Sequence, residues 1–155
     1  MGATHVNVTI RNPAEPERTW EGQFLVDTGA TDCLVPRQHL EAIGLKPRGG
    51  RTYELADGSE LRLDVTVAEV EFMGEIVGAT VIFGGDQAEP LLGVTALESV
   101  GIEVDPVNQQ LKRLPAVRLK RLARADRSGY SRSNSSRVKP ACRMMARSKP
   151  TPTSR

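Results

Sequence analysis

Polar and apolar residues alternate in short runs along this chain of 155 residues, and long helical patterns are missing. Residues 5–10 (His-Val-Asn-Val-Thr-Ile) alternate with a period of two and end at Asn12-Pro13, which predicts a strand and a turn. The charged segment 14–18 is expected to be a loop. Residues 20–26 are predicted to form a second strand, which leads to Asp27.

Hairpins are predicted in the middle of the chain. Two alternating runs, 51–56 and 59–65, flank Asp57-Gly58, and this arrangement is a strong short-range hairpin signal. A second hairpin is expected across Met73-Gly74, and a last one across the turn 105–108, which has Pro at its second position. The strands that the pattern predicts beyond the first hairpin are residues 65–72, 75–77, 79–83, 102–104 and 110–114.

Two short helices are predicted, at residues 37–44 and 94–100. Pro36 suits the first helical position of one helix, and Gly44 suits its C-terminal cap. Gly101 ends the other helix. Many short strands with regular turn signals and two minor helices favour an all-β fold, and specifically a small closed β-barrel.

Composition divides the chain into two parts. Residues 1–115 contain 9 basic and 18 acidic side chains, a net charge of −9, whereas residues 116–155 contain 12 basic and one acidic, a net charge of +11. We therefore predict one globular domain over 1–115 and a basic, largely disordered tail over 116–155, with a few turns of basic helix near 116–125. Aromatic residues make up only 4% of the chain, so the core must consist mainly of Val, Leu and Ile.

Other sequence features narrow the functional classes. The two cysteines, Cys33 and Cys142, form no disulfide or zinc pattern, and His5 and His39 have no ligand spacing, so we expect no metal and no cofactor. No signal peptide and no apolar run long enough to span a bilayer is visible, which makes a cytoplasmic location the expectation. The tail leaves open a weak nucleic-acid or other anionic partner.

The stretch that carries candidate chemistry is residues 24–36, Phe-Leu-Val-Asp-Thr-Gly-Ala-Thr-Asp-Cys-Leu-Val-Pro. It places Asp27 between two apolar runs, in a turn of small residues, and burying an unpaired carboxylate is costly. Two carboxylates that share a proton can hydrolyse an amide, because one deprotonates the attacking water while the other polarises the scissile carbonyl. Gly29 would allow two such carboxylates to approach closely, and the Thr28 hydroxyl could hold the loop.

These residues resemble the active-site loop of the aspartic proteases of clan AA, specifically of its single-domain, retropepsin-like branch. The resemblance covers roughly residues 5–115, because a flap hairpin at 51–65 and the motif Leu91-Leu92-Gly93 before a short helix follow in the family's order. Leu-Leu-Gly, a short helix, then Asp-Pro and a hairpin look closer to the prokaryotic members than to viral proteases, whose Gly-Arg-Asn or Gly-Arg-Asp at the helix is absent.

The resemblance implies an aspartic endopeptidase that acts as a homodimer on peptide or protein substrates. The chain has no second Asp-Thr-Gly or Asp-Ser-Gly, so two copies would each supply one Asp27. By the same resemblance Thr28, Gly29 and Ala30 support the catalytic loop, and the flap, residues 53–62, covers the substrate. The flap residues singled out for substrate binding are Tyr53, Leu55, Ala56, Asp57 and Gly58.

Three alternatives accompany this interpretation. A retropepsin fold that does not cleave would be a binding module for a peptide or, through the basic tail, for nucleic acid. Asp32, in the turn after the motif, is expected to be a solvated structural residue. Cys33 could be a nucleophile, but its apolar run and the lack of a nearby histidine favour a buried structural cysteine.

Overall fold

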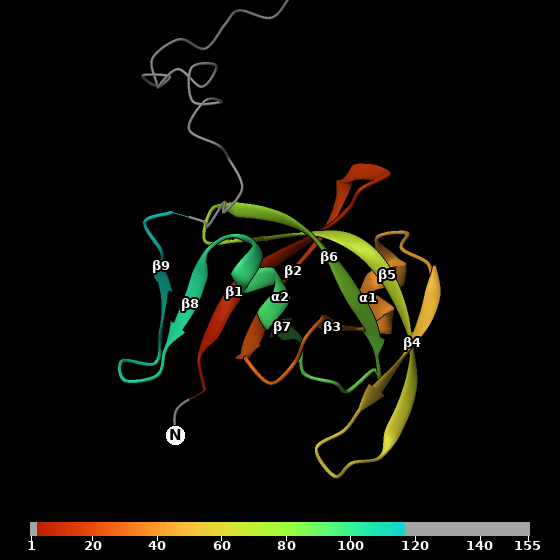
Figure 1. The fold of residues 1–155 in the computed structure, drawn as a ribbon. Coiled ribbons are helices and arrows are strands. Elements are labelled where there is room, and N and C mark those ends of the chain that lie inside the picture. Colours follow the sequence, from red (N-terminus) through yellow and green to blue (C-terminus); the bar gives the residue numbers. More distant parts are fainter. Residues whose placement is uncertain (1–2, 117–155) are drawn as a thin grey trace, which may run out of the picture. The chain divides into compact units, whose positions relative to one another are not determined.

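A computed structural model describes residues 3–116, in which strands dominate and the two helices are short (Figure 1). In order, the elements of this part are β1 (His5–Asn12), β2 (Glu15–Asp27), β3 (Cys33–Pro36), α1 (Arg37–Ala42), β4 (Gly49–Glu54), β5 (Glu60–Phe72), β6 (Glu75–Gly84), β7 (Leu91–Gly93), α2 (Val94–Ser99), β8 (Ile102–Asp105) and β9 (Gln110–Arg113). The predicted all-β class is therefore confirmed. The predicted tail and its basic helix lie, except for residue 116, outside the described residues.

Six strands close into a barrel. They follow one another in the order β1-β2-β7-β3-β6-β5, and β5 pairs back onto β1 with Val70 opposite Ile10. β4 is attached to the other end of β5, outside this ring. Closure gives each strand of the ring a neighbour on both sides, which leaves the ring without a free edge strand. The predicted small closed barrel is confirmed.

The long strand β5 joins the barrel to the flap hairpin. Its first half pairs with β4, from Glu60 opposite Glu54 to Val65 opposite Gly49, and its second half pairs with β6. The β4–β5 hairpin extends away from the barrel at the bottom of Figure 1. Both hairpins predicted from Asp57-Gly58 and Met73-Gly74 are present. Met73 and Gly74 have φ angles of 51° and 78°, which suit the tight turn between β5 and β6.

Several predicted strand boundaries were wrong; for example, the runs 59–65 and 65–72 are one strand, β5. Segment 14–18 was expected to be a loop, but residues 15–18 belong to β2. Their side chains are exposed, so they give no apolar alternation by which the strand could be recognised. The pairing shifts register between Arg11 and Asn12, and this irregularity accommodates the extra residues of β2. Residues 75–77 and 79–83 are one strand, β6, because Gly78 keeps its place in the ladder opposite Glu69.

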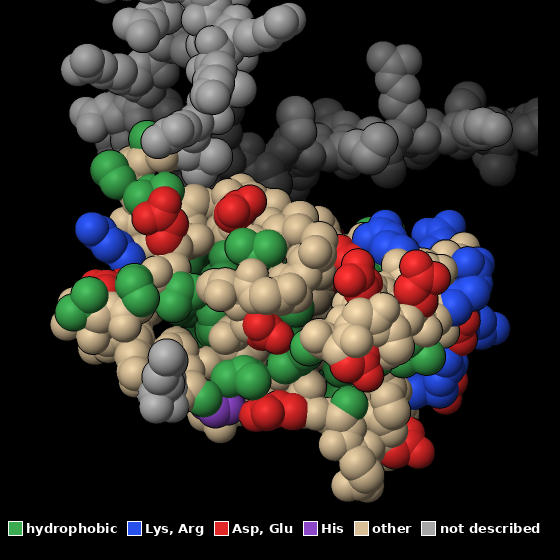
Figure 2. Space-filling view, turned by 60° about the horizontal axis from the view of Figure 1, so that its bottom comes forward, with side chains coloured by type: hydrophobic (Ala, Val, Ile, Leu, Met, Phe, Trp, Pro, Cys, Tyr) green, Lys and Arg blue, Asp and Glu red, His purple; other side chains and the backbone are tan. Residues whose placement is uncertain are grey.

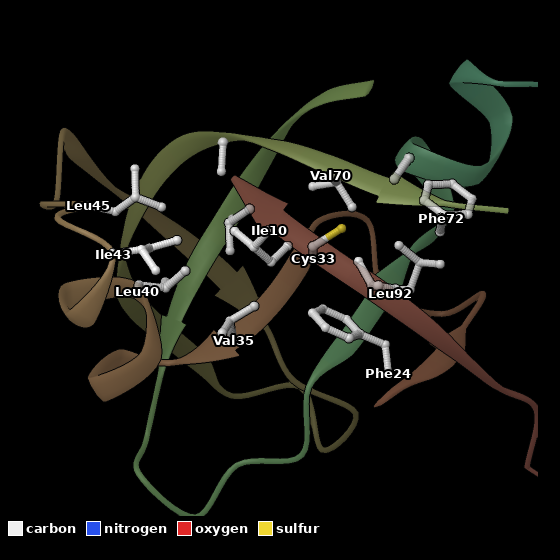
Figure 3. Close-up of a cluster of buried hydrophobic side chains, with 14 of the residues drawn as sticks. Ile10, Phe24, Cys33, Val35, Leu40, Ile43, Leu45, Val70, Phe72 and Leu92 are labelled. Atoms are coloured by element: carbon white, nitrogen blue, oxygen red, sulfur yellow. The ribbon is translucent and has the colours of Figure 1, made fainter. Parts of the chain in front are cut away.

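The barrel interior is filled with aliphatic side chains and the three phenylalanines of the chain. Phe24, Ile10 and Leu92 are completely buried, and Figure 3 shows them with neighbours from β3, β5 and α1 in one cluster. Burying a side chain of this size stabilises the fold by about 1.5–3 kcal/mol relative to leaving it in water. The expected Val, Leu and Ile core is confirmed, with Phe24, Phe72 and Phe83 inside it.

The two helices cover the barrel through few residues. α1 follows β3 directly, buries Leu40 and ends before Gly44, whose φ of 81° suits a residue just past a helix C-terminus. The prediction that Pro36 is the first helical residue of α1 was wrong. Pro36 is the N-cap, because it still belongs to β3, where it pairs with Gly84 of β6. Neither helix in the described part of the chain is long and apolar enough to cross a membrane.

Candidate active site

Asp27 is the last residue of β2, where the strand leaves the barrel. The strand pairs in parallel with β7, which places Asp27 opposite Gly93, and Phe24 anchors it in the core. The Asp27 side chain is half-buried, and its Oδ1 accepts a hydrogen bond of 2.9 Å from the Gly29 N–H. The Ala30 N–H also donates to the Asp27 carbonyl oxygen, at 3.2 Å. The small-residue turn therefore fixes the direction of the carboxylate.

The Leu-Leu-Gly motif and the start of α2 hold the Asp27 loop in place. Leu92 is completely buried, and the first N–H groups of α2 donate to the loop: Val94 to the Ala30 oxygen at 2.8 Å, and Thr95 to the Thr31 oxygen at 3.3 Å. Helix-terminal N–H groups have no partner within their helix, so the loop carbonyls satisfy them. A Cβ on Gly93 would lie 2.6 Å from the Asp32 backbone, which explains the need for glycine.

A groove of about 870 Å³ lies between the Asp27 loop and the flap. Of the predicted residues, Asp27, Gly29, Ala30, Tyr53, Leu55 and Ala56 line it. Leu34, Leu63 and Ile82 also line it and give it an apolar wall, which the sequence analysis did not identify. A cleft with a few polar groups on an apolar wall is typical of a ligand site.

The remaining predicted residues lie outside this groove lining. Thr28 is exposed, and Asp57 and Gly58 form the tip of the flap. Asp57 accepts two hydrogen bonds from Ser59, one from its hydroxyl and one from its backbone N–H at 2.9 Å, and these lower the pKa of Asp57. Gly58 has a φ of 82°, so glycine is needed for the turn.

The sequence of residues 19–99 matches the family described as "gag-polyprotein putative aspartyl protease". The chain belongs to this family. The match covers β2 from residue 19 with the Asp-Thr-Gly turn, the flap hairpin, the Leu-Leu-Gly motif and α2, so the resemblance inferred from those motifs is confirmed. A search of curated proteins found no match.

One acidic residue of this protease-family site was wrongly predicted. Asp32, expected to be solvated, has a side chain that is only 6% exposed, and its Oδ2 accepts hydrogen bonds from the Arg51 guanidinium and, at 2.7 Å, from the Tyr53 hydroxyl. The prediction rested on turn statistics, which do not show that a distant strand supplies two donors. Arg51 was missed too, although a period of two puts it on the same face of β4 as Tyr53.

Asp32 also changes the titration of its neighbours. Burial raises the pKa of Tyr53 to about 12, with a further contribution from the hydrogen bond to Asp32. Burial raises the pKa of the Cys33 thiol to about 11, and the Asp32 charge adds to this effect. A thiol with a raised pKa forms little of the nucleophilic thiolate near neutral pH. Cys33 is 1% exposed, which confirms the interpretation as a buried structural cysteine.

The two histidines are engaged in different parts of the barrel. The His5 Nε2 lies 3.0 Å from the Glu89 Oε1, and the His39 ring stacks on Trp20 with 4.4 Å between ring centroids. On the face shown in Figure 2, acidic side chains are scattered across the surface, whereas most basic ones gather at the edge where Figure 1 has α1 and β4.

Proposed function

We propose that this protein is an aspartic endopeptidase that acts as a homodimer, with one Asp27 from each copy. The observation that carries the proposal is the place of Asp27: its carboxylate is oriented by the Gly29 N–H at the floor of an open groove beneath the flap. Membership of an aspartyl protease family supports the same reaction.

The need for a second copy follows from the chemistry. Hydrolysis by carboxylates requires one that accepts a proton from water and one that donates a proton to the carbonyl oxygen of the peptide. Within the described residues, the one buried carboxylate that lines the groove, Asp32, is already bound to Arg51 and Tyr53. A twofold axis through the Asp27 turns would instead bring two identical carboxylates together.

The proposed substrate is an extended peptide or protein segment. It would lie between the Asp27 turn and the flap as an added strand, with backbone hydrogen bonds supplying affinity and side-chain pockets supplying selectivity. The apolar wall of Leu34, Leu63 and Ile82 supports apolar side chains next to the scissile bond. One carboxylate takes a proton from water as the water oxygen attacks the carbonyl carbon, and the other gives its proton to the carbonyl oxygen. The C–N bond of the resulting diol then breaks, the proton taken from water passes to the leaving amine, and a diol hydroxyl returns a proton to the carboxylate pair.

The direct test is Asp27→Asn. The amide cannot take a proton from water, so we expect peptide cleavage to fall by about a hundredfold or more. Cleavage of a peptide library would be measured from pH 4 to 8, with pepstatin inhibition as a second readout. Asp86→Asn is the matched control, because Asp86 is an exposed acid in the β6–β7 loop that does not line the groove.

Retention of parent-level cleavage by Asp27→Asn would show that the mechanism is wrong. Circular dichroism and sedimentation of both variants would establish that the fold and the association state are unchanged. If the parent protein forms a dimer and cleaves nothing across this pH range, the non-proteolytic binding module becomes the better description.

A further inference from the structure

The flap strand β4 is connected to the active-site loop by side chains rather than by the sheet. Within the described residues, the backbone of β4 is hydrogen-bonded to β5 alone, and β5 and β6 separate β4 from β3 in the strand order. The Asp27 loop runs into β3 at Cys33. A flap attached through one hairpin partner is free to swing unless something else holds it.

That additional hold is the Asp32 carboxylate. Arg51 and Tyr53, two positions apart on β4, both donate to its Oδ2 across the groove, although they lie 19 and 21 residues away in the sequence. The Asp32 side chain is 6% exposed and the Arg51 side chain is 51% exposed, so a buried carboxylate binds a guanidinium at the surface. A carboxylate at this depth requires partners.

We propose that Asp32 is a positioning residue that fastens the base of the flap over Asp27. Asp32 follows Asp27 by five residues, and α2 fixes this loop through its bonds to Ala30 and Thr31. The position of β4 is therefore set relative to the same rigid loop that orients Asp27. Asp27, Asp32, Arg51 and Tyr53 all line one groove, so a change in the fastening changes the space for substrate.

The fastening has a direct consequence for substrate binding, which rests on the proposed peptidase function. If the flap is held in place before substrate arrives, the ordering of β4 is not required at the moment of binding. Releasing the flap should therefore raise KM. A purely structural ion pair would behave differently, because its loss would lower the amount of folded enzyme and leave the KM of the remaining enzyme unchanged.

The test uses Tyr53→Phe, which removes one hydroxyl, and Asp32→Asn, which removes the charge. Amide hydrogen exchange of residues 49–54 should become about tenfold faster or more in each variant, while exchange in β1 stays as in the parent. In peptide cleavage assays, KM should rise about fivefold or more in both variants. Arg51→Lys keeps the charge, so its exchange rate in residues 49–54 and its KM should lie between those of the parent and those of Arg51→Ala.

Glu75→Gln is the matched control. It removes an ion pair with Arg113 that joins β6 to β9, and neither residue lines the groove. Exchange of residues 49–54 and KM should both stay at parent values in this variant.

Unchanged exchange and unchanged KM in a folded Tyr53→Phe variant would overturn the proposal. This variant keeps the test decisive even if Asp32→Asn fails to fold. The exchange measurement needs no catalysis, so a parent protein that cleaves nothing would contradict the peptidase function and still leave the fastening of the flap open to test.

Discussion

At the scale of single residues, the two acids of the Asp27 loop have opposite environments. Asp27 is half-buried at the floor of an open groove, held by one backbone N–H. Asp32 is buried and bound by two side chains from the flap. From the sequence, Asp27 was predicted to be the buried acid and Asp32 the solvated one. The apolar neighbours of Asp27 belong to the core, but Asp27 itself stands where the strand leaves it.

Replacement of Gly93 should destabilise the fold even though alanine adds a single methyl group. Gly93→Ala would place a Cβ 2.6 Å from backbone atoms of Asp32 and 2.7 Å from the Thr31 oxygen, so the loop must shift. We expect the free energy of unfolding to fall by about 1–3 kcal/mol. Denaturant unfolding, followed by the fluorescence of Trp20 (the single tryptophan of the chain), would measure this change at fixed protein concentration.

Gly78→Ala provides the comparison for this substitution. Gly78 lies within β6, and nothing stands within 4 Å of the Cβ that alanine would add there. Its unfolding free energy should stay close to that of the parent or rise slightly. Equal stability of Gly93→Ala and the parent would show that the loop does not depend on the close approach at Gly93.

At the scale of elements, the flap is one hairpin that is ordered by separate hydrogen bonds at its tip and at its base. Its tip is ordered by the hydrogen bonds between Asp57 and Ser59, and its base by those of Arg51 and Tyr53 to Asp32. The tip depends on contacts within five residues and was predicted from Asp57-Gly58. The base depends on contacts between β4 and the Asp27 loop and was not predicted.

The titration of Tyr53 reports on the base of the flap. Its pKa is raised to about 12, from the ordinary value near 10, by burial and then by the hydrogen bond to Asp32. A raised pKa means that Tyr53 stabilises the folded state below about pH 10 and that this contribution is lost as the pH rises through about 12. We expect absorbance at 295 nm to show an ionisation well above that of free tyrosine.

Two variants assign this ionisation. The late step should disappear in Tyr53→Phe, which leaves Tyr130 as the remaining tyrosine of the chain. In Asp32→Asn the step should move to lower pH, because the charge and the hydrogen bond that oppose ionisation are gone. A titration of Asp32→Asn indistinguishable from that of the parent would mean that Asp32 does not contact Tyr53 in solution.

At the scale of the whole molecule, the described barrel carries one Asp27 and an open groove, and the proposed function requires a second copy to supply the other carboxylate. Mixing the parent with Asp27→Asn tests this arrangement. If subunits exchange freely, only dimers with two parent subunits are active, and an equal mixture should retain about a quarter of the cleavage activity of the same total amount of parent.

A site complete within one chain would give a different result. The equal mixture would then retain about half of the activity, since each parent chain would act independently. The dependence on the parent fraction, quadratic or linear, would be measured over several mixing ratios after subunit exchange has reached equilibrium. A mixture of the parent with Asp86→Asn, which should stay fully active, controls for effects of mixing.

Local signals in the sequence determined most of the elements and the identity of the loop. Alternation predicted the strands of the barrel, and the dipeptides Asp57-Gly58 and Met73-Gly74 predicted two hairpins. Asp-Thr-Gly with Leu-Leu-Gly indicated the family. These features depend on neighbours within a few residues, because backbone conformation and turn chemistry are set there. The length of β2 was missed because its exposed charged residues carry no apolar alternation.

Only the tertiary structure decided which acid is buried and what holds the flap. The closure of β5 onto β1, the approach of the Asp32 backbone to Gly93, and the meeting of Arg51 and Tyr53 on Asp32 join residues about 20 to 60 positions apart. The alternation pattern tells which face of a strand is buried, but not which distant donor a carboxylate meets there. That choice is made by how the barrel closes.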